Sequence, residues 1–107
     1  MNREKSMRTT AKNTDAAVHA IIQGFVQGVG FRYSAMHKAR SLALKGWVKN
    51  LDNGDVEIWA EGSSAAISAF EDWLAKGPPG ARVDRLLSTP RSPLGQFSDF
   101  EIETDGW

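Results

Sequence analysis

The segment from Gly24 to Arg32 reads Gly-Phe-Val-Gln-Gly-Val-Gly-Phe-Arg and carries residue types suited to holding an anion. Glycine lets backbone N–H groups turn toward a ligand because no Cβ opposes a positive φ. A helical pattern begins at Phe31, and a helix N-terminus presents unpaired N–H donors and the positive end of the helix dipole. Arg32 adds a permanent charge with a forked donor geometry that suits phosphate. The segment therefore predicts a small oxyanion site, for phosphate above all.

Two common phosphate-binding motifs are absent from this segment. A Walker loop needs Gly-Lys followed by Ser or Thr, and a dinucleotide fingerprint needs a third glycine where Tyr33 stands. Taken alone, the glycine pattern also fits a bulged turn whose arginine is solvated.

Asn50, at the end of the segment Gly46-Trp-Val-Lys-Asn, is the second candidate. Its side chain shares a strand face with Val48, which should point toward the helices. A carboxamide both donates and accepts hydrogen bonds, so it can hold a water molecule in one orientation. Asparagine is also a frequent turn residue, and Asn50 could instead fix the hairpin that follows.

The remaining titratable residues favour structural roles. His37 falls on the polar face of a helical pattern and His19 on the outer face of a strand, with no shared metal site indicated by their spacing. Asp55, Glu57 and Glu61 alternate with core positions, so they predict a solvated acidic sheet face rather than an acid/base pair.

The totals limit the possible functions. A chain of 107 residues with 41% hydrophobic content predicts one soluble domain with its own core. A net charge of zero argues against nucleic-acid binding, and no apolar run reaches the roughly 20 residues of a membrane span. The absence of cysteine excludes disulfides, thiolate nucleophiles and cysteine-bound zinc, and it fits a cytoplasmic setting.

The first 16 residues differ in composition from the rest. Residues 1–16 are basic and lack the apolar segment of a secretory signal, which predicts a disordered tail, with a nucleic-acid-binding arm or a processed leader as alternatives. Residues 17–104 are expected to form the folded domain.

The candidate residues need strands and helices to position them. Alternating apolar residues predict strands over Ala17–Gln23, Gly46–Leu51 and Asp55–Glu61, with Asp52-Asn53-Gly54 as a hairpin turn. Helical spacing begins at Phe31, and we expect Lys45-Gly46 to end that helix. Ser63 or Ser64 should cap a second helix, whose apolar stripe is Ile67, Phe70, Trp73 and Leu74.

The second half of the chain completes the arrangement. Gly77-Pro-Pro-Gly80 should stop the second helix, followed by a strand over Ala81–Ser88, a loop over Thr89–Gly95 and a short strand within Phe97–Glu103. The order βαββαβ plus a short C-terminal strand predicts an α+β, ferredoxin-like split βαβ fold, an antiparallel sheet with both helices on one face.

Two of these segments together resemble the signatures of the acylphosphatase family. Gly24-x-Val-Gln-Gly-Val-x-Phe-Arg32 matches the first signature, and Gly46-x-Val-x-Asn50 with Gly54-x-Val56 matches the second. The segments Gly77–Val83 and Phe97–Ile102 are also similar to family segments. The match runs from about Val18 to Ile102, with no departure at a position on which the family relies.

The resemblance implies hydrolysis of an acyl phosphate, a carboxyl-phosphate anhydride, to carboxylate and inorganic phosphate without metal or cofactor. Arg32 and nearby backbone N–H groups would bind the phosphoryl group, and Asn50 would orient the attacking water. The implied phosphate-binding residues are Gln27, Gly28, Val29, Gly30, Phe31 and Arg32. Inorganic phosphate would be the product and a competitive inhibitor, and a monomer is expected.

Two other functions fit parts of the pattern. A non-catalytic phosphate-binding regulatory module would need Arg32 and N–H donors but no water-positioning amide. An RNA-binding domain could stack bases on a ferredoxin-like sheet, but the open face is predicted to be acidic. The sequence favours the enzyme.

Overall fold

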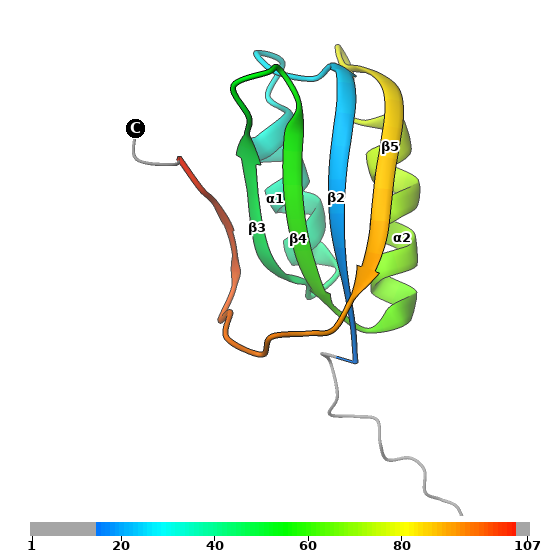
Figure 1. Ribbon diagram of the computed structural model, residues 1–107, viewed down its shortest axis with the longest axis vertical. Coiled ribbons are helices and arrows are strands. Elements are labelled where there is room, and N and C mark those ends of the chain that lie inside the picture. The colour runs from blue at the N-terminus through cyan, green and yellow to red at the C-terminus, as the bar shows by residue number, and fades with distance from the viewer. Residues whose placement is uncertain (1–14, 105–107) are drawn as a thin grey trace, which may run out of the picture.

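Alternating apolar residues build a five-stranded sheet, and two amphipathic helices pack on one of its faces (Figure 1). The computed structural model describes residues 15–104. In chain order the elements are β2 (Ala16–Phe25), α1 (Phe31–Ser41), β3 (Lys45–Asn50), β4 (Val56–Gly62), α2 (Ser64–Lys76), β5 (Arg82–Arg91) and β6 (Phe100–Ile102). The sheet order is β5-β2-β4-β3-β6, which confirms the ferredoxin-like α+β fold.

The expected basic tail lies outside the described residues, apart from Asp15 and Ala16, and Ala16 already belongs to β2. No helix within residues 15–104 is long and apolar enough to cross a membrane.

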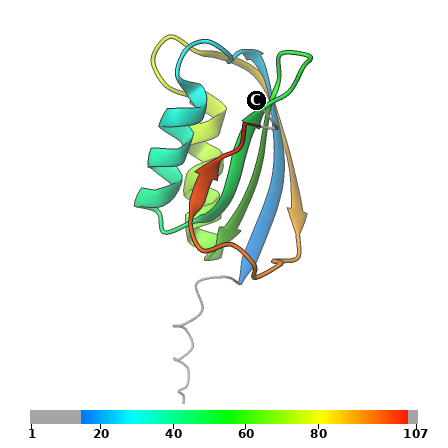
Figure 2. The ribbon, with the colours of Figure 1, turned by 90° about the vertical axis from the view of Figure 1, so that its left-hand side faces the viewer.

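The core lies between the sheet and the helices, and no helix covers the other sheet face (Figure 2). The residues predicted to point inward from β4, namely Val56, Ile58 and Ala60, are fully buried. On α2 the predicted stripe is buried at Ile67, Phe70 and Leu74, and the Ser63 hydroxyl caps the helix by accepting from the Ala66 N–H. Each such buried side chain stabilises the fold by about 1.5–3 kcal/mol.

The predicted hairpin between β3 and β4 brings Asn50 to the end of the sheet. Antiparallel pairing runs from Lys45 opposite Glu61 to Asn50 opposite Val56, so the loop begins immediately after Asn50. The Asn53 side chain accepts from the Asp55 N–H at 3.0 Å, and the Leu51 N–H donates to the Asp55 carbonyl at 2.8 Å. Asn53, rather than Asn50, therefore fixes this turn.

The end of α1 differs from the prediction. The helix stops at Ser41, and the left-handed residue that reverses the chain is Ala43, with φ of 60°, not Gly46. The early stop allows Leu44 to turn into the core. Gly46 instead lies in β3, where a Cβ would stand 1.9 Å from the Trp59 carbonyl oxygen, so close packing of the two strands requires glycine there.

The beginning of the glycine-rich segment also belongs to the sheet. β2 extends through Gly24 to Phe25, two residues beyond the predicted strand, and its register against β5 shifts between Gln23 and Gly24. A Cβ on Gly24 would stand 2.1 Å from the Arg82 carbonyl oxygen. Gly24 therefore permits this irregular pairing. The loop that is left to contact a ligand is shorter than the glycine-rich segment and covers residues 26–30 (hereafter the glycine loop).

The predicted acidic sheet face is only partly solvated. Glu61 is 1% exposed because the connection from β5 to β6 crosses over it. Its carboxylate accepts hydrogen bonds from the Trp59 indole N–H at 2.7 Å and from the backbone N–H groups of Leu94 at 2.7 Å and Gly95 at 3.1 Å. Three donors offset the cost of burying the carboxylate. Glu57 remains half-buried and contacts His19 at 2.7 Å.

The last two strands depart from the expected boundaries. β5 continues through Pro90 to Arg91, where a loop was predicted. Pro90 is tolerated because β5 is an edge strand, and proline, which has no N–H to donate, is confined to such strands. β6 is limited to Phe100–Ile102 and pairs parallel with β3, which makes the sheet mixed rather than purely antiparallel. This pairing places the residues after Ile102 beside the end of β3.

Candidate functional site

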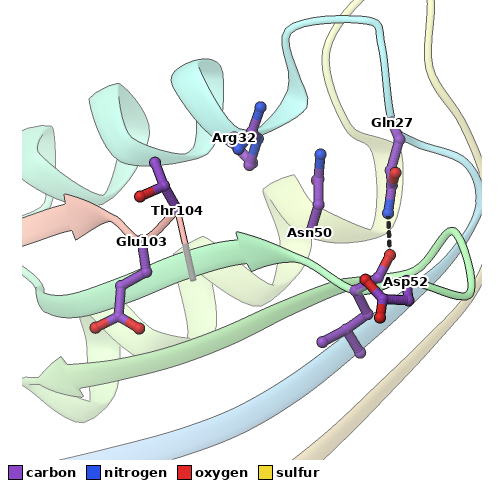
Figure 3. Close-up of a pocket in the computed structure, with 7 residues that line it drawn as sticks. Gln27, Arg32, Asn50, Asp52, Glu103 and Thr104 are labelled. Carbon is purple, nitrogen blue, oxygen red and sulfur yellow. Dashed lines mark hydrogen bonds between the residues drawn. The ribbon is translucent and has the colours of Figure 1, made fainter. Parts of the chain in front are cut away.

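Four segments meet at one end of the sheet, where β2 leads into the glycine loop, α1 begins, β3 ends and β6 runs out (Figure 1, Figure 3). Two adjoining cavities open there, and Arg32, Asn50 and Thr104 line both. The first has a volume of about 530 Å³, within the range of small-molecule sites. Its other lining residues are Gln27, Leu51, Asp52 and Glu103, and those of the second cavity are Val26, Gly28, Gly30, Phe31, Tyr33 and Ile102.

The N-terminus of α1 is open to a ligand. Its N-cap residue is Gly30, which has no side chain to accept from the first-turn N–H groups, whereas Ser63 does so in α2. The first helical bond at this end runs from the Ser34 N–H to the Gly30 carbonyl. The N–H groups of Phe31 and Arg32 thus lack helical acceptors and add their partial positive charge to the second cavity.

Two glycines give the loop its shape. Gly28 and Gly30 have φ of 78° and 74°, in the left-handed region, and a Cβ on either would meet no atom within 4 Å. Backbone conformation, rather than space, is therefore what requires glycine at these positions. Both line the second cavity, while the Val29 side chain between them packs against the core and lines neither cavity.

The Gln27 side chain ties the glycine loop to the β3–β4 hairpin. Its Nε2 donates to the carbonyl oxygens of Leu51 at 2.7 Å and Asp55 at 2.9 Å (Figure 3). Because both amide hydrogens are committed there, any bond from Gln27 to an anion must come from its backbone N–H.

Arg32 is the one positively charged side chain among the described residues that line either cavity. It is half-buried in the first turn of α1, and its guanidinium forms no hydrogen bond or ion pair with residues 15–104. Arg40, about two turns further along α1, pairs instead with Asp99 and Glu101. An arginine held near a helix N-terminus without a protein partner is suited to a bidentate anion.

The side-chain oxygen of Asn50 lacks a hydrogen-bond partner among the described residues. This oxygen, Oδ1, is buried, although the Asn50 side chain lines both cavities. An unsatisfied buried acceptor costs about 1–3 kcal/mol, so native proteins seldom retain one without a reason. Because Oδ1 itself is buried, a water in the cavity reaches it only when the side-chain amide turns over, which exchanges the oxygen and the nitrogen.

Several lining residues were not singled out by the sequence: Tyr33, Leu51, Asp52, Ile102, Glu103 and Thr104. Strand alternation places Thr104 on the same face as Ile102, and this is the one sequence feature that could have indicated Thr104 as a lining residue. Its relevance depends on the parallel pairing of β6 with β3, which continues beyond β6 as the Glu103 N–H donates to the Val48 carbonyl at 2.9 Å. Within residues 15–104, no three His, Asp or Glu side chains gather in a way that could hold a metal ion.

Comparison with known proteins identifies the family. The family model described as acylphosphatase matches residues 18–102, which contain the glycine loop, Arg32 and Asn50. The chain belongs to the acylphosphatase family. An acylphosphatase from Mannheimia succiniciproducens is 48% identical over 83 residues, which cover 78% of this chain and 92% of that protein.

Solved acylphosphatase structures share the fold as well as the sequence. The structure from Coxiella burnetii is 40% identical with a TM-score of 0.82 and covers 91% of this chain and 100% of its own. The structure from Bacillus subtilis is 39% identical with a TM-score of 0.79 and covers 82% of this chain and 98% of its own.

Proposed function

We propose that this acylphosphatase-family chain hydrolyses acyl phosphates, with Arg32 and the glycine loop binding the phosphoryl group and Asn50 orienting the attacking water. The water oxygen bonds to phosphorus as the bond from phosphorus to the acyl oxygen breaks. The products are a carboxylate and inorganic phosphate. The observation that carries the proposal is that Asn50, whose amide oxygen has no partner among the described residues, lines the same two cavities as Arg32.

Phosphoryl binding is the task of the second cavity. The N–H groups from Gly28 to Arg32 belong to the left-handed turn and the uncapped start of α1, and Arg32 lines the same cavity as these residues. Phosphoryl transfer passes through a loose transition state with charge spread over the equatorial oxygens. Donors fixed in advance at those oxygens lower the barrier without having to reorganise.

The chemistry requires no strong general acid. The conjugate acid of the leaving carboxylate has a pKa of about 4, so it departs as an anion at neutral pH. With its oxygen turned to the cavity, the side-chain amide of Asn50 accepts a hydrogen bond from the attacking water and holds it for attack on phosphorus. The substrate's own phosphoryl oxygens take up the proton that the water loses.

A direct assay tests the proposal. Purified full-length chain should hydrolyse benzoyl phosphate in the presence of EDTA, and inorganic phosphate should inhibit competitively. Folded protein whose rate of hydrolysis does not exceed the uncatalysed rate would contradict the proposed enzymatic function. Phosphate binding without turnover would identify an anion-binding module of the same fold.

A further inference from the structure

An aromatic side chain stands exposed at the edge of the proposed phosphoryl site. Tyr33 follows Arg32 in the first turn of α1, lines the second cavity and is 61% exposed. Its ring contacts the His37 ring one turn further along the helix, edge to face, with centroids 4.6 Å apart. The ring is therefore supported by His37 and exposed to solvent, on a residue that borders the cavity.

The geometry of phosphoryl transfer limits where the acyl group can lie. The attacking and leaving oxygens lie roughly in line through phosphorus. The phosphoryl oxygens face the glycine loop and the start of α1, and the water is held by Asn50 at the end of β3, so the acyl group extends toward the open mouth of the two cavities. Tyr33 is the exposed aromatic residue among the described residues that line these cavities.

Apolar residues close the bottom of the second cavity. Val26 and Phe31 are buried beneath it, at 1% exposure each, and Ile102 borders it from β6. An acyl group cannot extend into the core there, so the exposed Tyr33 ring is the aromatic surface that the cavity offers to it.

The charges of the site disfavour a second anion on the substrate. Arg32, the one cation among the described residues that line the cavities, is engaged by the phosphoryl group, and the first cavity adds Asp52 and Glu103. Figure 3 shows the Glu103 carboxylate directed away from Arg32 and Asn50, so Asp52 is the acid whose charge a long acyl chain would meet.

We infer that Tyr33 determines acyl-group specificity, packing against an uncharged, apolar acyl group. This inference rests on the proposed function and deepens it. Preferred substrates are acyl phosphates with aromatic or other apolar acyl groups, and acyl groups that end in a carboxylate are disfavoured.

The first experiment compares kcat/KM for benzoyl phosphate with kcat/KM for acetyl phosphate. In Tyr33→Ala the ratio of the benzoyl kcat/KM to the acetyl kcat/KM should fall about three- to tenfold, as expected for the loss of one aromatic contact. Tyr33→Phe keeps the ring and should stay within about twofold of wild type. Phe25→Ala is the matched control, because Phe25 is an exposed aromatic residue, at 55%, that lines neither cavity.

An unchanged ratio in Tyr33→Ala overturns the inference while the enzymatic function stands. So does an equal loss in Tyr33→Phe, because the hydroxyl and not the ring would then be responsible. Thermal unfolding of each variant confirms that it is folded. A wild-type chain that hydrolyses neither substrate overturns both the inference and the proposed function.

The second experiment tests charge with two acyl chains of equal length, butanoyl phosphate and 3-carboxypropanoyl phosphate. Wild type should prefer the butanoyl compound. Asp52→Asn should raise the relative kcat/KM of the carboxylate-bearing substrate about two- to fivefold, less at high salt, as expected for one partly screened charge. Asp72→Asn makes the same charge change on an exposed residue outside both cavities. Equal use of the two substrates, or equal effects of the two variants, overturns the charge preference.

Discussion

The side-chain amide of Gln27 donates to the Leu51 carbonyl at 2.7 Å, and so joins the glycine loop to the residue that directly follows Asn50. The two halves of the site come from segments 24 residues apart in sequence, and this bond sets the spacing between them. A second bond from the same nitrogen, to the Asp55 carbonyl, holds the far side of the hairpin. Gln27 is therefore a positioning residue.

Gln27→Ala should impair both stability and turnover, because two part-buried carbonyls each lose one of their donors. We expect a loss of about 1–3 kcal/mol in the free energy of unfolding, measured by urea titration, and a raised inhibition constant for phosphate. Gln23→Ala is the control: its amide makes one long contact, 3.4 Å to Asp55, and the expected loss is below about 1 kcal/mol. Equal losses in the two variants would contradict the positioning role.

Arg32→Gln should weaken phosphate binding and turnover together, because the guanidinium is the only formal positive charge lining the cavities of the described structure. We expect kcat/KM to fall about 10²- to 10³-fold and the inhibition constant for phosphate to rise about ten- to a hundredfold. Arg85→Gln removes an exposed charge outside both cavities and controls for long-range electrostatics. Unchanged phosphate affinity in Arg32→Gln would place the anion site elsewhere.

Asn50→Ala should separate catalysis from stability. Because Oδ1 has no partner, its removal breaks no hydrogen bond, and the melting temperature should be unchanged or higher while kcat falls about 10²- to 10³-fold. Phosphate inhibition should persist. Asn53→Ala is the matched control, because that amide makes two hydrogen bonds to Asp55 and should lower stability by about 1 kcal/mol without abolishing turnover. Joint loss of stability and phosphate binding in Asn50→Ala would make Asn50 structural.

Glu61→Gln should destabilise the fold, because the carboxylate offers two acceptor oxygens to three N–H donors and an amide offers only one. We expect a loss of about 1–3 kcal/mol, or a melting temperature lower by about 4–8 °C for each kcal/mol. Glu57→Gln, on the same sheet face but half-buried, should cost less than about 1 kcal/mol. A scanning-calorimetry result in which the two variants behave alike would indicate that the burial of Glu61 carries little energy.

Local sequence signals predicted the parts of the fold that local forces determine. Alternation identified β2, β3 and β4, the Asn53-Gly54 pair identified the hairpin, and Ser63 identified the start of α2. Arg32 and Asn50 were selected for their chemistry and for their place beside a glycine loop and a strand end. The structure brings them to the same cavities.

The predictions that were wrong concern features that depend on contacts between distant segments. Alternation correctly places Glu61 on the outer sheet face, but it cannot indicate that residues 94–95 cover that position. The early end of α1 follows from the burial of Leu44 and the close approach of Gly46 to β4, which together override the preference for glycine in a left-handed cap. Thr104 reaches the cavity through a parallel pairing that leaves no local pattern in the sequence.

The pairing of β6 has a consequence for slow motions of the protein. β6 covers the side of β3 that would otherwise be a sheet edge, with only three residues in regular pairing. Short elements with few contacts detach more readily than the whole domain unfolds. When β6 detaches, the Val48 carbonyl loses the Glu103 N–H and Thr104 leaves the wall beside Asn50. Amide hydrogen exchange at Gly46 and Glu103, whose donors bridge these two segments, therefore reports the lifetime of the assembled site.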